Sequence, residues 1–179
     1  MTQDDAAAPS AEALLAASIW PQVDRALAGV SARPEPSVRD VIVHIPPDQI
    51  VRGLRALKQD RELAFDYLRC LTCVDNEDDG IDVVYHLYSI AGRHNLTVKT
   101  QLPPDDLTVD TATSVWRAAD WYEREAQEMF GVRFRGHPDP RNLLMPEDIT
   151  DSFPLRKDHP LAEIEVLQGE GVAYSEEPA

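Results

Sequence analysis

The 179-residue chain has only two cysteines and lacks any apolar run that approaches the roughly 20 residues needed to cross a bilayer. Two thiols are too few to ligate an iron–sulfur cluster or a four-cysteine zinc ion. Basic residues are also scarce: 17 Lys and Arg face 32 Asp and Glu, and the formal net charge is −15. A nucleic-acid-binding chain needs a basic surface, so this charge balance excludes nucleic acid as the expected partner.

Signatures of catalysis are missing as well. The sequence contains no Gly-rich phosphate loop, nucleophile elbow or kinase motif. No metal-ligand spacing relates the five histidines, which are His44, His86, His94, His137 and His159. Cys70 and Cys73 form a C-x-x-C pair, but in a strand this odd spacing places the thiols on opposite faces, so a structural role is expected. The chain is therefore predicted to hold no catalytic, cofactor or metal site of its own.

Hydrophobic periodicity predicts one α+β domain in the middle of the chain. Residues 41–45 predict a strand, 48–59 an amphipathic helix, and 81–90 with 96–102 an antiparallel hairpin. Residues 65–74 are open between a short helix followed by a strand and one continuous helix. The order predicts a two-layer domain with a small mixed or antiparallel sheet packed by helices. We expect a helical segment and linker over 1–36, with 33–36 as the linker, a core over 37–131, and a long extended Pro-rich tail over 132–179.

A further helix is predicted to begin near Trp116 and to end at Phe130. Its apolar residues recur every three or four positions, at Val115, Ala119, Tyr122, Ala126, Met129 and Phe130. Gly131 follows where a left-handed cap is needed. Glu123 and Glu125 flank the apolar face and Arg124 points away from it, which in an isolated helix would be an ordinary charged rim.

The segment after this helix combines prolines with apolar side chains. Five prolines between 131 and 160 exclude a long helix or a central strand, yet the interspersed Leu and Phe residues are too apolar for a free linker. Its charge is balanced, with five basic and five acidic residues, whereas the rest of the chain carries 12 and 27. We therefore expect the segment to lie extended along the surface of a partner.

Several short motifs follow one another between Trp116 and Leu161. They are Glu123-Arg124-Glu125, Met129-Phe130-Gly131, Gly136-His137-Pro138, Arg141, Leu144-Met145 and Pro154-Leu155-Arg156-Lys157-Asp158 with Pro160. In this order and spacing the set resembles the signature of the 30-kDa-type hydrophilic subunit, also called the C subunit, of proton-pumping NADH:quinone oxidoreductase (respiratory complex I). A looser similarity in the order of elements extends back to about Val41.

The resemblance implies a cofactor-free structural and assembly subunit of the peripheral arm of complex I. Such a protein would support NADH:quinone electron transfer coupled to proton pumping. It would dock on the large hydrogenase-like quinone-site subunit (the D subunit), near the cluster-bearing B subunit. Iron–sulfur clusters and FMN are expected in partner subunits, and the chain is expected to be peripheral on the cytoplasmic side of the bacterial cell membrane, which it reaches only through partners.

The resemblance and the chemistry of the tail also imply a partner interface. The expected interface residues are Glu123, Arg124, Glu125, His137, Arg141, Phe153, Leu155, Arg156, Lys157 and Asp158. The basic side chains would make charge-assisted contacts, and the apolar ones would be anchors. Two alternatives stay open. One is the equivalent subunit of a complex I relative, such as a membrane-bound hydrogenase or a plastoquinone-linked dehydrogenase; the other is a free-standing thiol redox protein that uses the C-x-x-C pair.

Overall fold

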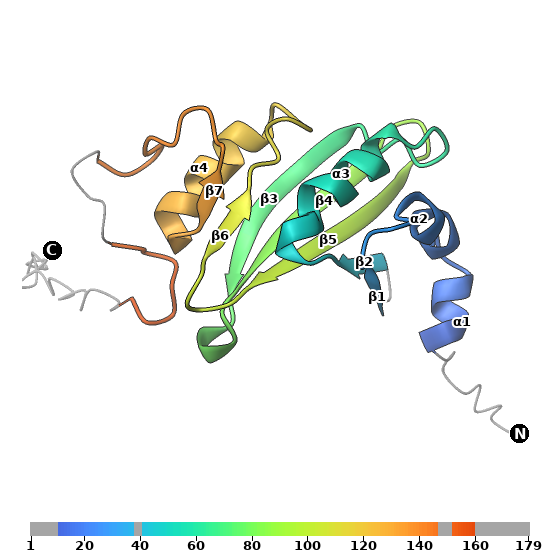
Figure 1. Ribbon diagram of the computed structural model, residues 1–179, viewed down its shortest axis with the longest axis horizontal. Coiled ribbons are helices and arrows are strands. Elements are labelled where there is room, and N and C mark those ends of the chain that lie inside the picture. The colour runs from blue at the N-terminus through green and yellow to red at the C-terminus, as the bar shows by residue number, and fades with distance from the viewer. Residues whose placement is uncertain (1–10, 38–40, 147–151, 160–179) are drawn as a thin grey trace, which may run out of the picture.

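A five-stranded sheet forms the centre of the protein, for which a computed structural model describes residues 11–37, 41–146 and 152–159 (Figure 1). The strand order is β1-β2-β5-β4-β3. The strands are β1 (Arg33–Pro36), β2 (Val41–His44), β3 (Tyr67–Asp75), β4 (Ile81–Ser89) and β5 (His94–Leu102). Neighbours pair antiparallel except β2 and β5, which run parallel. The predicted α+β class with a small mixed sheet is confirmed.

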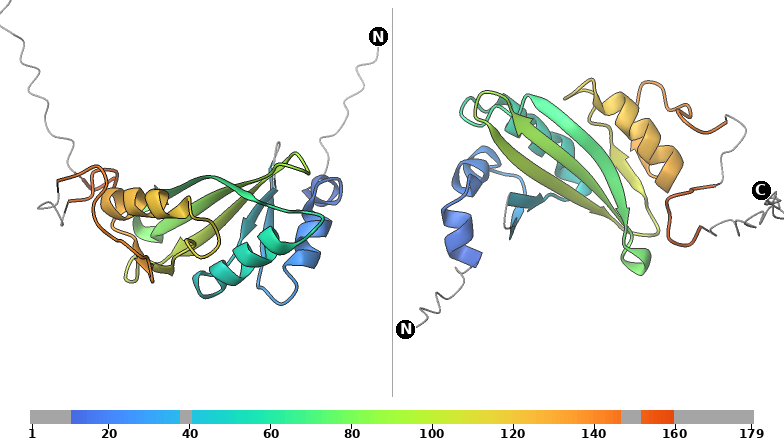
Figure 2. Two further views of the ribbon diagram at one scale, coloured as in Figure 1. Left: turned by 90° about the horizontal axis from the view of Figure 1, so that it is seen from above. Right: turned by 180° about the vertical axis from the view of Figure 1, so that it is seen from behind.

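Four helices and a second small sheet complete the described part of the chain. The helices are α1 (Ala11–Ala16), α2 (Trp20–Ala26), α3 (Ile50–Gln59) and α4 (Ala119–Phe130). The small sheet pairs β6 (Thr108–Asp110) with β7 (Arg133–Arg135) in parallel, and single 3₁₀ turns occur at Pro47–Gln49 and Glu77–Asp79. Helix α3 lies across one face of the main sheet, whereas α4 lies beside its β3 edge (Figures 1 and 2).

Apolar alternation in the strands and a helical period in α3 build one core between them. The predicted hairpin is confirmed: β4 pairs with β5 from Ile81 opposite Leu102 to Ser89 opposite His94. Alternate residues of these strands, including Val83 and Tyr85, are fully buried. On α3 the residues at three- and four-residue spacing that face the sheet are Ile50, Leu54 and Leu57, all fully buried. Each such side chain stabilises the fold by roughly 1.5–3 kcal/mol.

Two segments differ from the expectation. Residues 67–75, which overlap the stretch left open between helix and strand, form β3, because pairing with β4 along the strand outweighs local propensity. The expected linker at 33–36 is wrong, since these residues form β1 and pair with β2. Pro34 and Pro36 are accommodated because β1 is an edge strand, where a missing N–H breaks no ladder on the outer side.

Helix α4 begins three residues later than predicted but ends as predicted. Trp116 lies in the turn before it, with its N–H donating to the carbonyl of Ala112. At the other end Gly131 has a φ of 76°, and its N–H donates to the carbonyl of Gln127, which confirms the left-handed cap. The chain then enters β7, so the first residues of the expected tail still pair with the domain.

Candidate functional site: the strap along helix α4

The residues after β7 run along α4 in the same direction as the helix (Figures 1 and 2). We call residues 136–146 and 152–159 the strap. Later residues of the strap contact later residues of α4. The side-chain amide of Gln127 donates to the carbonyl of Pro140 at 2.9 Å. Further along, the N–H of Leu155 donates to the carbonyl of Met129 at 3.1 Å. The segment that was expected to lie along a partner therefore packs along a helix of its own chain.

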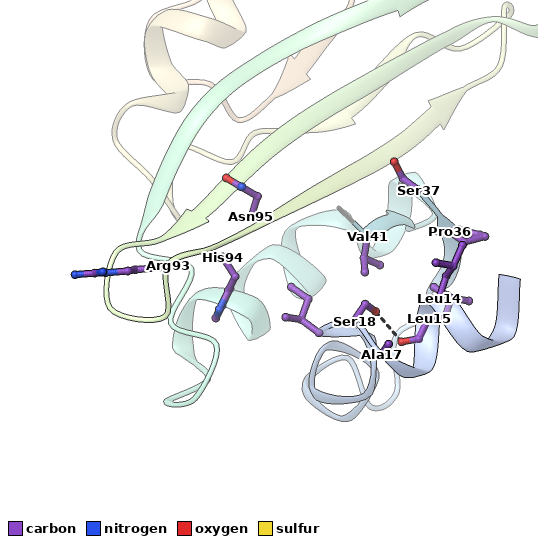
Figure 3. Close-up of a pocket in the computed structure, with 11 residues that line it drawn as sticks. Leu14, Leu15, Ala17, Ser18, Pro36, Ser37, Val41, Arg93, His94 and Asn95 are labelled. Atoms are coloured by element: carbon purple, nitrogen blue, oxygen red, sulfur yellow. Dashed lines mark hydrogen bonds between the residues drawn. The ribbon is translucent and has the colours of Figure 1, made fainter. Parts of the chain in front are cut away.

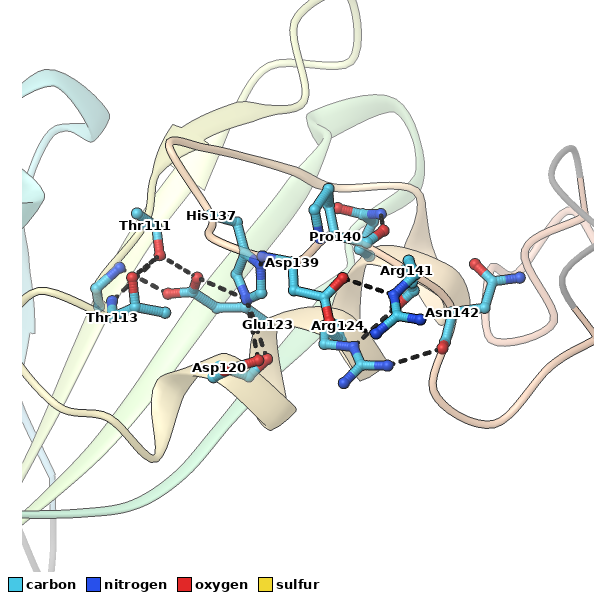
Figure 4. A network of polar contacts seen from close by, with 12 residues as sticks. Thr111, Thr113, Asp120, Glu123, Arg124, His137, Asp139, Pro140, Arg141 and Asn142 are labelled. Atoms are coloured by element: carbon cyan, nitrogen blue, oxygen red, sulfur yellow. Dashed lines mark hydrogen bonds and ion pairs between the residues drawn. The ribbon is translucent and has the colours of Figure 1, made fainter.

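Arg124 attaches the middle of the strap to α4. Its Nε donates to the carbonyl of Arg141 at 2.8 Å and its Nη2 to the carbonyl of Asn142 at 2.9 Å (Figure 4). The guanidinium also lies 6.0 Å from the ring centre of Trp121. A planar fork with several fixed donors suits two successive carbonyl oxygens. The structure thus gives Arg124 a partner within the chain, and its contact with another subunit stays a prediction.

Glu128 holds the next turn of the strap and was not among the expected site residues. Its buried carboxylate accepts three successive backbone N–H groups, from Leu143 and Leu144 at 2.9 Å and from Met145 at 3.2 Å. A carboxylate that accepts several N–H groups replaces the secondary structure that these donors lack. The only sequence signal was indirect, namely an irregular apolar segment whose N–H groups need acceptors.

Glu123 is the most deeply buried acidic residue at the site, with an exposed fraction of 0%. Its Oε1 accepts the N–H of Ala112 at 2.6 Å, and its Oε2 lies 2.5 Å from the hydroxyl of Thr111. Burial raises the pKa of Glu123 to about 7, partly offset by these two hydrogen bonds, while the nearby charge of Asp120 raises it further. The glutamate expected at the flank of the helix therefore lies inside the domain.

His137 closes the strap over Glu123. Its ring is 2% exposed, and Nε2 lies 3.1 Å from the backbone carbonyl of Asp120 and 3.9 Å from Oε2 of Glu123. Its Nδ1 accepts the N–H of Asp139 at 3.1 Å, so the ring proton sits on Nε2 in this arrangement (Figure 4). His137 thereby fixes the first residues of the strap to the first turn of α4.

Arg156 fixes the end of the strap to the C-terminus of α4. Its Nε donates to the carbonyl of Phe130 at 2.7 Å, a group that the helix itself leaves without a partner. Its guanidinium packs 4.4 Å from the ring centre of Phe153. Gly131 permits this approach, because a Cβ there would lie 2.5 Å from Nη2 of Arg156 and 2.9 Å from the Phe153 ring.

Lys157 extends the attachment to the turn after β3. Its backbone N–H donates to the carboxylate of Asp75 at 2.8 Å, and its Nζ donates to Glu77 at 2.9 Å. The hydrogen bond from the Lys157 backbone lowers the pKa of Asp75, with smaller contributions from the N–H of Glu77 and the charge of Lys157. All three residues are at least partly exposed, so solvent screens this pair.

Five of the expected interface residues are exposed, namely Glu125, Arg141, Leu155, Lys157 and Asp158. Arg141 forms a two-bond pair with Asp139, at 2.8 Å for each bond, and this lowers the pKa of Asp139 to about 2. Among the apolar residues of α4 and the strap, Leu144, Trp121 and Leu155 stand out with exposed fractions of 65%, 64% and 55%. Polar groups hold the strap from within, while large apolar side chains face outward.

The thiols lie on opposite faces of β3, as the spacing predicts: Cys73 is buried in the core and Cys70 is only partly exposed. Burial raises the pKa of Cys70, and the charge of Glu125 raises it further. Burial likewise raises the pKa of Cys73, well beyond that of a free thiol. A raised pKa reduces the thiolate fraction on which redox chemistry depends, which disfavours a thiol redox site.

No group of three His, Cys, Asp or Glu side chains within residues 11–37, 41–146 and 152–159 is arranged to hold a metal ion. A cavity of about 440 Å³ lies at the far end of the molecule from α4, between α1, β1 and the start of β5 (Figure 3). Its walls mix apolar side chains such as Leu15 and Val41 with Arg93 and Asn95. Within the same described ranges, no helix combines the length and apolarity needed to cross a bilayer.

This architecture defines a class of protein: an α+β domain in which the residues after β7, 136–146 and 152–159, are held as a strap along α4. A family model described as "Respiratory-chain NADH dehydrogenase, 30 Kd subunit" matches residues 43–165, and the chain belongs to this family. The match includes the whole strap and all of the main sheet except β1 and the first two residues of β2. The family resemblance of the sequence motifs is thereby confirmed.

Individual relatives agree. The C 2 subunit of the NADH-quinone oxidoreductase of Rhizobium meliloti (strain 1021) is 46% identical over 121 residues, which cover 65% of this chain and 64% of the relative. The C subunit of Chloroherpeton thalassium is 42% identical over 109 residues, covering 60% and 45%. The C subunit of Roseiflexus castenholzii is 41% identical over 129 residues, covering 71% and 74%. The matched region thus spans less than two-thirds of the first two relatives.

Two solved structures share the fold. One is a chain of the membrane-bound sulfane sulfur reductase, an archaeal respiratory membrane complex, with a TM-score of 0.69, 25% identity, and coverage of 89% of this chain and 95% of that one. The other is a trypsin-resistant fragment of Nqo5, with a TM-score of 0.56, 24% identity, and coverage of 66% and 96%. The latter likeness concerns the fold alone.

Proposed function

We propose that this protein is a cofactor-free structural and assembly subunit of a proton-pumping NADH:quinone oxidoreductase, and that it docks through α4 and the strap. The observation that carries the proposal is that polar side chains hold the strap in place while its large apolar side chains face outward. Arg124, Glu128 and Arg156 bind groups of their own chain, which presents Leu144 and Leu155 outward on a fixed backbone. Large apolar side chains on an ordered segment are typical of interface anchors.

The arginines take a different role in this proposal from the one first expected. Instead of reaching partner carboxylates with their whole donor fork, Arg124 and Arg156 give the strap its shape. Their substitution would weaken docking by loosening the strap, whereas substitution of Leu144 would remove an anchor directly. A loosened strap weakens docking because a partner must order it as it binds, whereas the loss of an anchor removes buried apolar contact.

The finer assignments rest on the family. The names of the relatives support an electron-transport complex that uses NADH and a quinone. Within it, the proposed partners are the large hydrogenase-like quinone-site subunit (the D subunit) and the cluster-bearing B subunit, which with other subunits would carry the clusters and FMN. The proposed location is the cytoplasmic side of the bacterial membrane, held there through these partners.

A second candidate is the equivalent subunit of a complex I relative. The fold likeness to a chain of an archaeal respiratory membrane complex, over 95% of that chain, favours keeping it. Both candidates use the same docking surface, and the co-purifying subunits distinguish them. A nickel-containing large subunit would indicate a hydrogenase-type complex, whereas NADH:quinone activity that responds to quinone-site inhibitors would indicate complex I.

The test is affinity purification of the full chain from its native membranes in mild detergent, with iron–sulfur subunits and NADH:quinone activity as readouts. Leu144→Asp should reduce the co-purified subunits about tenfold or more, since anchor losses of about 2 kcal/mol or more are typical. Arg156→Ala should also reduce them, because it loosens the strap. Ile90→Asp is the matched control, because Ile90 is similarly exposed but follows β4. Wild-type yields for both strap variants would contradict docking through this surface.

A further inference from the structure

The buried carboxyl group of Glu123 has no part in the docking surface, yet three segments meet at it. It projects from α4, accepts hydrogen bonds from Thr111 and Ala112 in the loop after β6, and faces His137 of the strap (Figure 4). The environment of this carboxyl group therefore depends on whether the helix, the loop and the strap are packed together. Its charge state therefore bears on how firmly the strap is attached.

The surroundings of Glu123 supply no compensating positive charge. The groups that face it are Asp120 on α4, the His137 ring of the strap and the phenol of Tyr85 on β4. In the hydrogen-bonded arrangement described above, the ring proton of His137 is on Nε2, which leaves the ring uncharged. No Lys or Arg of the described residues forms an ion pair with Glu123. An ionised carboxylate in this position is poorly solvated and has no counter-ion.

Two buried oxygen atoms near Glu123 have no hydrogen-bond partner among the described residues. They are the hydroxyl of Tyr85 and Oδ1 of Asp120. The Asp120 oxygen lies 3.6 Å from Nε2 of His137, the same nitrogen that lies 3.9 Å from Glu123. Two carboxyl groups thus converge on one imidazole, and Oδ1 of Asp120 has no donor among the described residues. A proton bound to this cluster would supply a donor that this buried carboxyl oxygen lacks.

The threonine pair beside Glu123 accommodates either protonation state. The hydroxyl of Thr111 lies 2.5 Å from Oε2 of Glu123 and 2.9 Å from the hydroxyl of Thr113, and it accepts the Thr113 N–H at 3.1 Å. When Glu123 is ionised, Thr113 donates to Thr111 and Thr111 donates to the carboxylate. When Glu123 is protonated, the carboxyl donates to Thr111, which donates to Thr113. Reversing the direction of these hydroxyl hydrogen bonds keeps Glu123 hydrogen-bonded to Thr111, and Thr111 to Thr113, in both states.

We propose that the carboxyl group of Glu123 is a reversible proton-binding site that couples the attachment of the strap on α4 to pH. Thr111 and Thr113 connect this site to the partly exposed loop, and the buried ring of His137 lies against it on the strap side. The proton-bound form favours the closed strap. Loss of the proton favours opening at His137, because water can then solvate the carboxylate.

The direction of the coupling follows from the two environments. In the closed structure, burial raises the pKa of Glu123 to about 7, whereas an exposed glutamate titrates near 4.5. Between these values the closed form holds the proton and the open form has lost it, so rising pH drives opening. From pH 6 to pH 8 the opening equilibrium constant should rise about tenfold, the ratio that proton linkage gives for these two pKa values.

The first measurement is a carboxyl ¹³C NMR titration of the full chain labelled at glutamate side chains, with no partner present. One resonance should titrate with a midpoint near pH 7, and it should be absent from Glu123→Gln. Glu125→Gln is the matched control, since Glu125 lies on the same helix but is exposed, and it should leave the resonance in place. A Glu123 midpoint between pH 4 and 5 would overturn the proposal.

The second measurement is hydrogen exchange at the amides of His137 and Asp139, corrected for the intrinsic effect of pH. In the wild type, the corrected opening should increase about tenfold from pH 6 to pH 8. In Glu123→Gln, which is neutral at every pH, it should be flat. The same pH dependence in Glu123→Gln as in the wild type would also overturn the proposal.

Two milder variants keep the test decisive if Glu123→Gln does not fold. Asp120→Asn removes the neighbouring negative charge and should lower the Glu123 midpoint, whereas Thr111→Val removes a hydrogen bond to the carboxylate and should raise it. Opposite or absent shifts in both variants contradict the proposal. The experiments involve no other protein, so their outcome is independent of whether the chain docks as proposed above.

Discussion

The sheet domain and the strap are held by different forces. In the domain, fully buried apolar residues such as Leu54, Val83 and Val98 join α3 to the sheet, and stability comes from apolar area removed from water. In the strap, two of the largest apolar side chains, Leu144 and Leu155, are more than half exposed, while side chains of α4 bind the strap backbone. The comparison shows that Leu144 and Leu155 are not packed against their own domain, as the proposed docking requires.

Helix α4 serves both regions with different residues. Ala119, Ala126 and Phe130 face the apolar core, whereas Glu123 and Glu128 are buried carboxylates that accept backbone N–H groups. A buried carboxylate is costly unless donors surround it, so these two glutamates fix the segments that supply the donors. The positions of these two glutamates on the helix thus determine where the loop after β6 and the strap lie.

The largest expected difference between the two regions is the effect of a leucine-to-alanine change on the free energy of unfolding. Leu54→Ala should lower the free energy of unfolding by about 2–5 kcal/mol, because it removes fully buried methyl groups and leaves a cavity between α3 and the sheet. Leu144→Ala, the same change on the strap, should stay within about 0.5 kcal/mol of the wild type. Urea unfolding measures both, and a large loss in Leu144→Ala would mean that the strap is packed like the core.

The pH dependence of stability should distinguish the buried carboxyl group of Glu123 from the apolar core. Because the folded-state pKa of Glu123, about 7, lies above its ordinary value of 4.5, its contribution favours folding at low pH and is lost as pH rises to 7. The difference between wild type and Glu123→Gln should change by at most about 3 kcal/mol over this window. Urea unfolding at pH 4.5, 6 and 8 measures it; a change of opposite sign would contradict the buried, uncompensated carboxylate.

Removal of the carboxylate that holds the strap should loosen the strap without unfolding the domain. Glu128→Ala deprives three backbone N–H groups of their acceptor and should make strap opening easier by about 1–3 kcal/mol. Limited proteolysis of the strap should accelerate accordingly, while the urea midpoint of the sheet changes less. Glu125→Ala, on the same helix but exposed, is the control and should leave the cleavage rate unchanged.

The smallest effect is expected at the exposed end of the strap. Lys157→Ala removes the ion pair with Glu77, in which both side chains are largely exposed, but keeps the backbone hydrogen bond to Asp75. Salt screens such pairs, so the cleavage rate of the strap should be indistinguishable from the wild type at physiological ionic strength. Faster cleavage that persists in high salt would show that Lys157 contributes packing as well.

The sequence predicts the parts of this structure that depend on local patterns. The β4–β5 hairpin, helix α3 and the Gly131 cap follow from alternation, helical period and backbone freedom, all of which are written in consecutive residues. Residues 67–75 become β3 only because β4 pairs with them, and β1 forms where prolines indicated a linker. These outcomes depend on tertiary partners that a local pattern does not contain.

The candidate site was predictable in its location more than in its contacts. The motifs identified α4 and the tail. The groups that Arg124 and Arg156 bind, however, are backbone carbonyl oxygens of the same chain. Every residue has such an oxygen, so a sequence motif does not indicate which one is bound. Glu128 was missed for the same reason, since its ligands are backbone N–H groups. Glu123 was placed at a flank because helical geometry alone does not reveal the loop that covers it.

Hydrogen exchange of the full chain, in the absence of any partner, tests the central claim most directly. If α4 holds the strap by polar contacts, the amides of Leu143, Leu144 and Met145 are protected in the wild type. In Glu128→Ala they should exchange at the rate of an open segment, while the amides of β4 and β5 keep their protection. Unprotected strap amides in the wild type, or protection that survives in Glu128→Ala, would contradict the account.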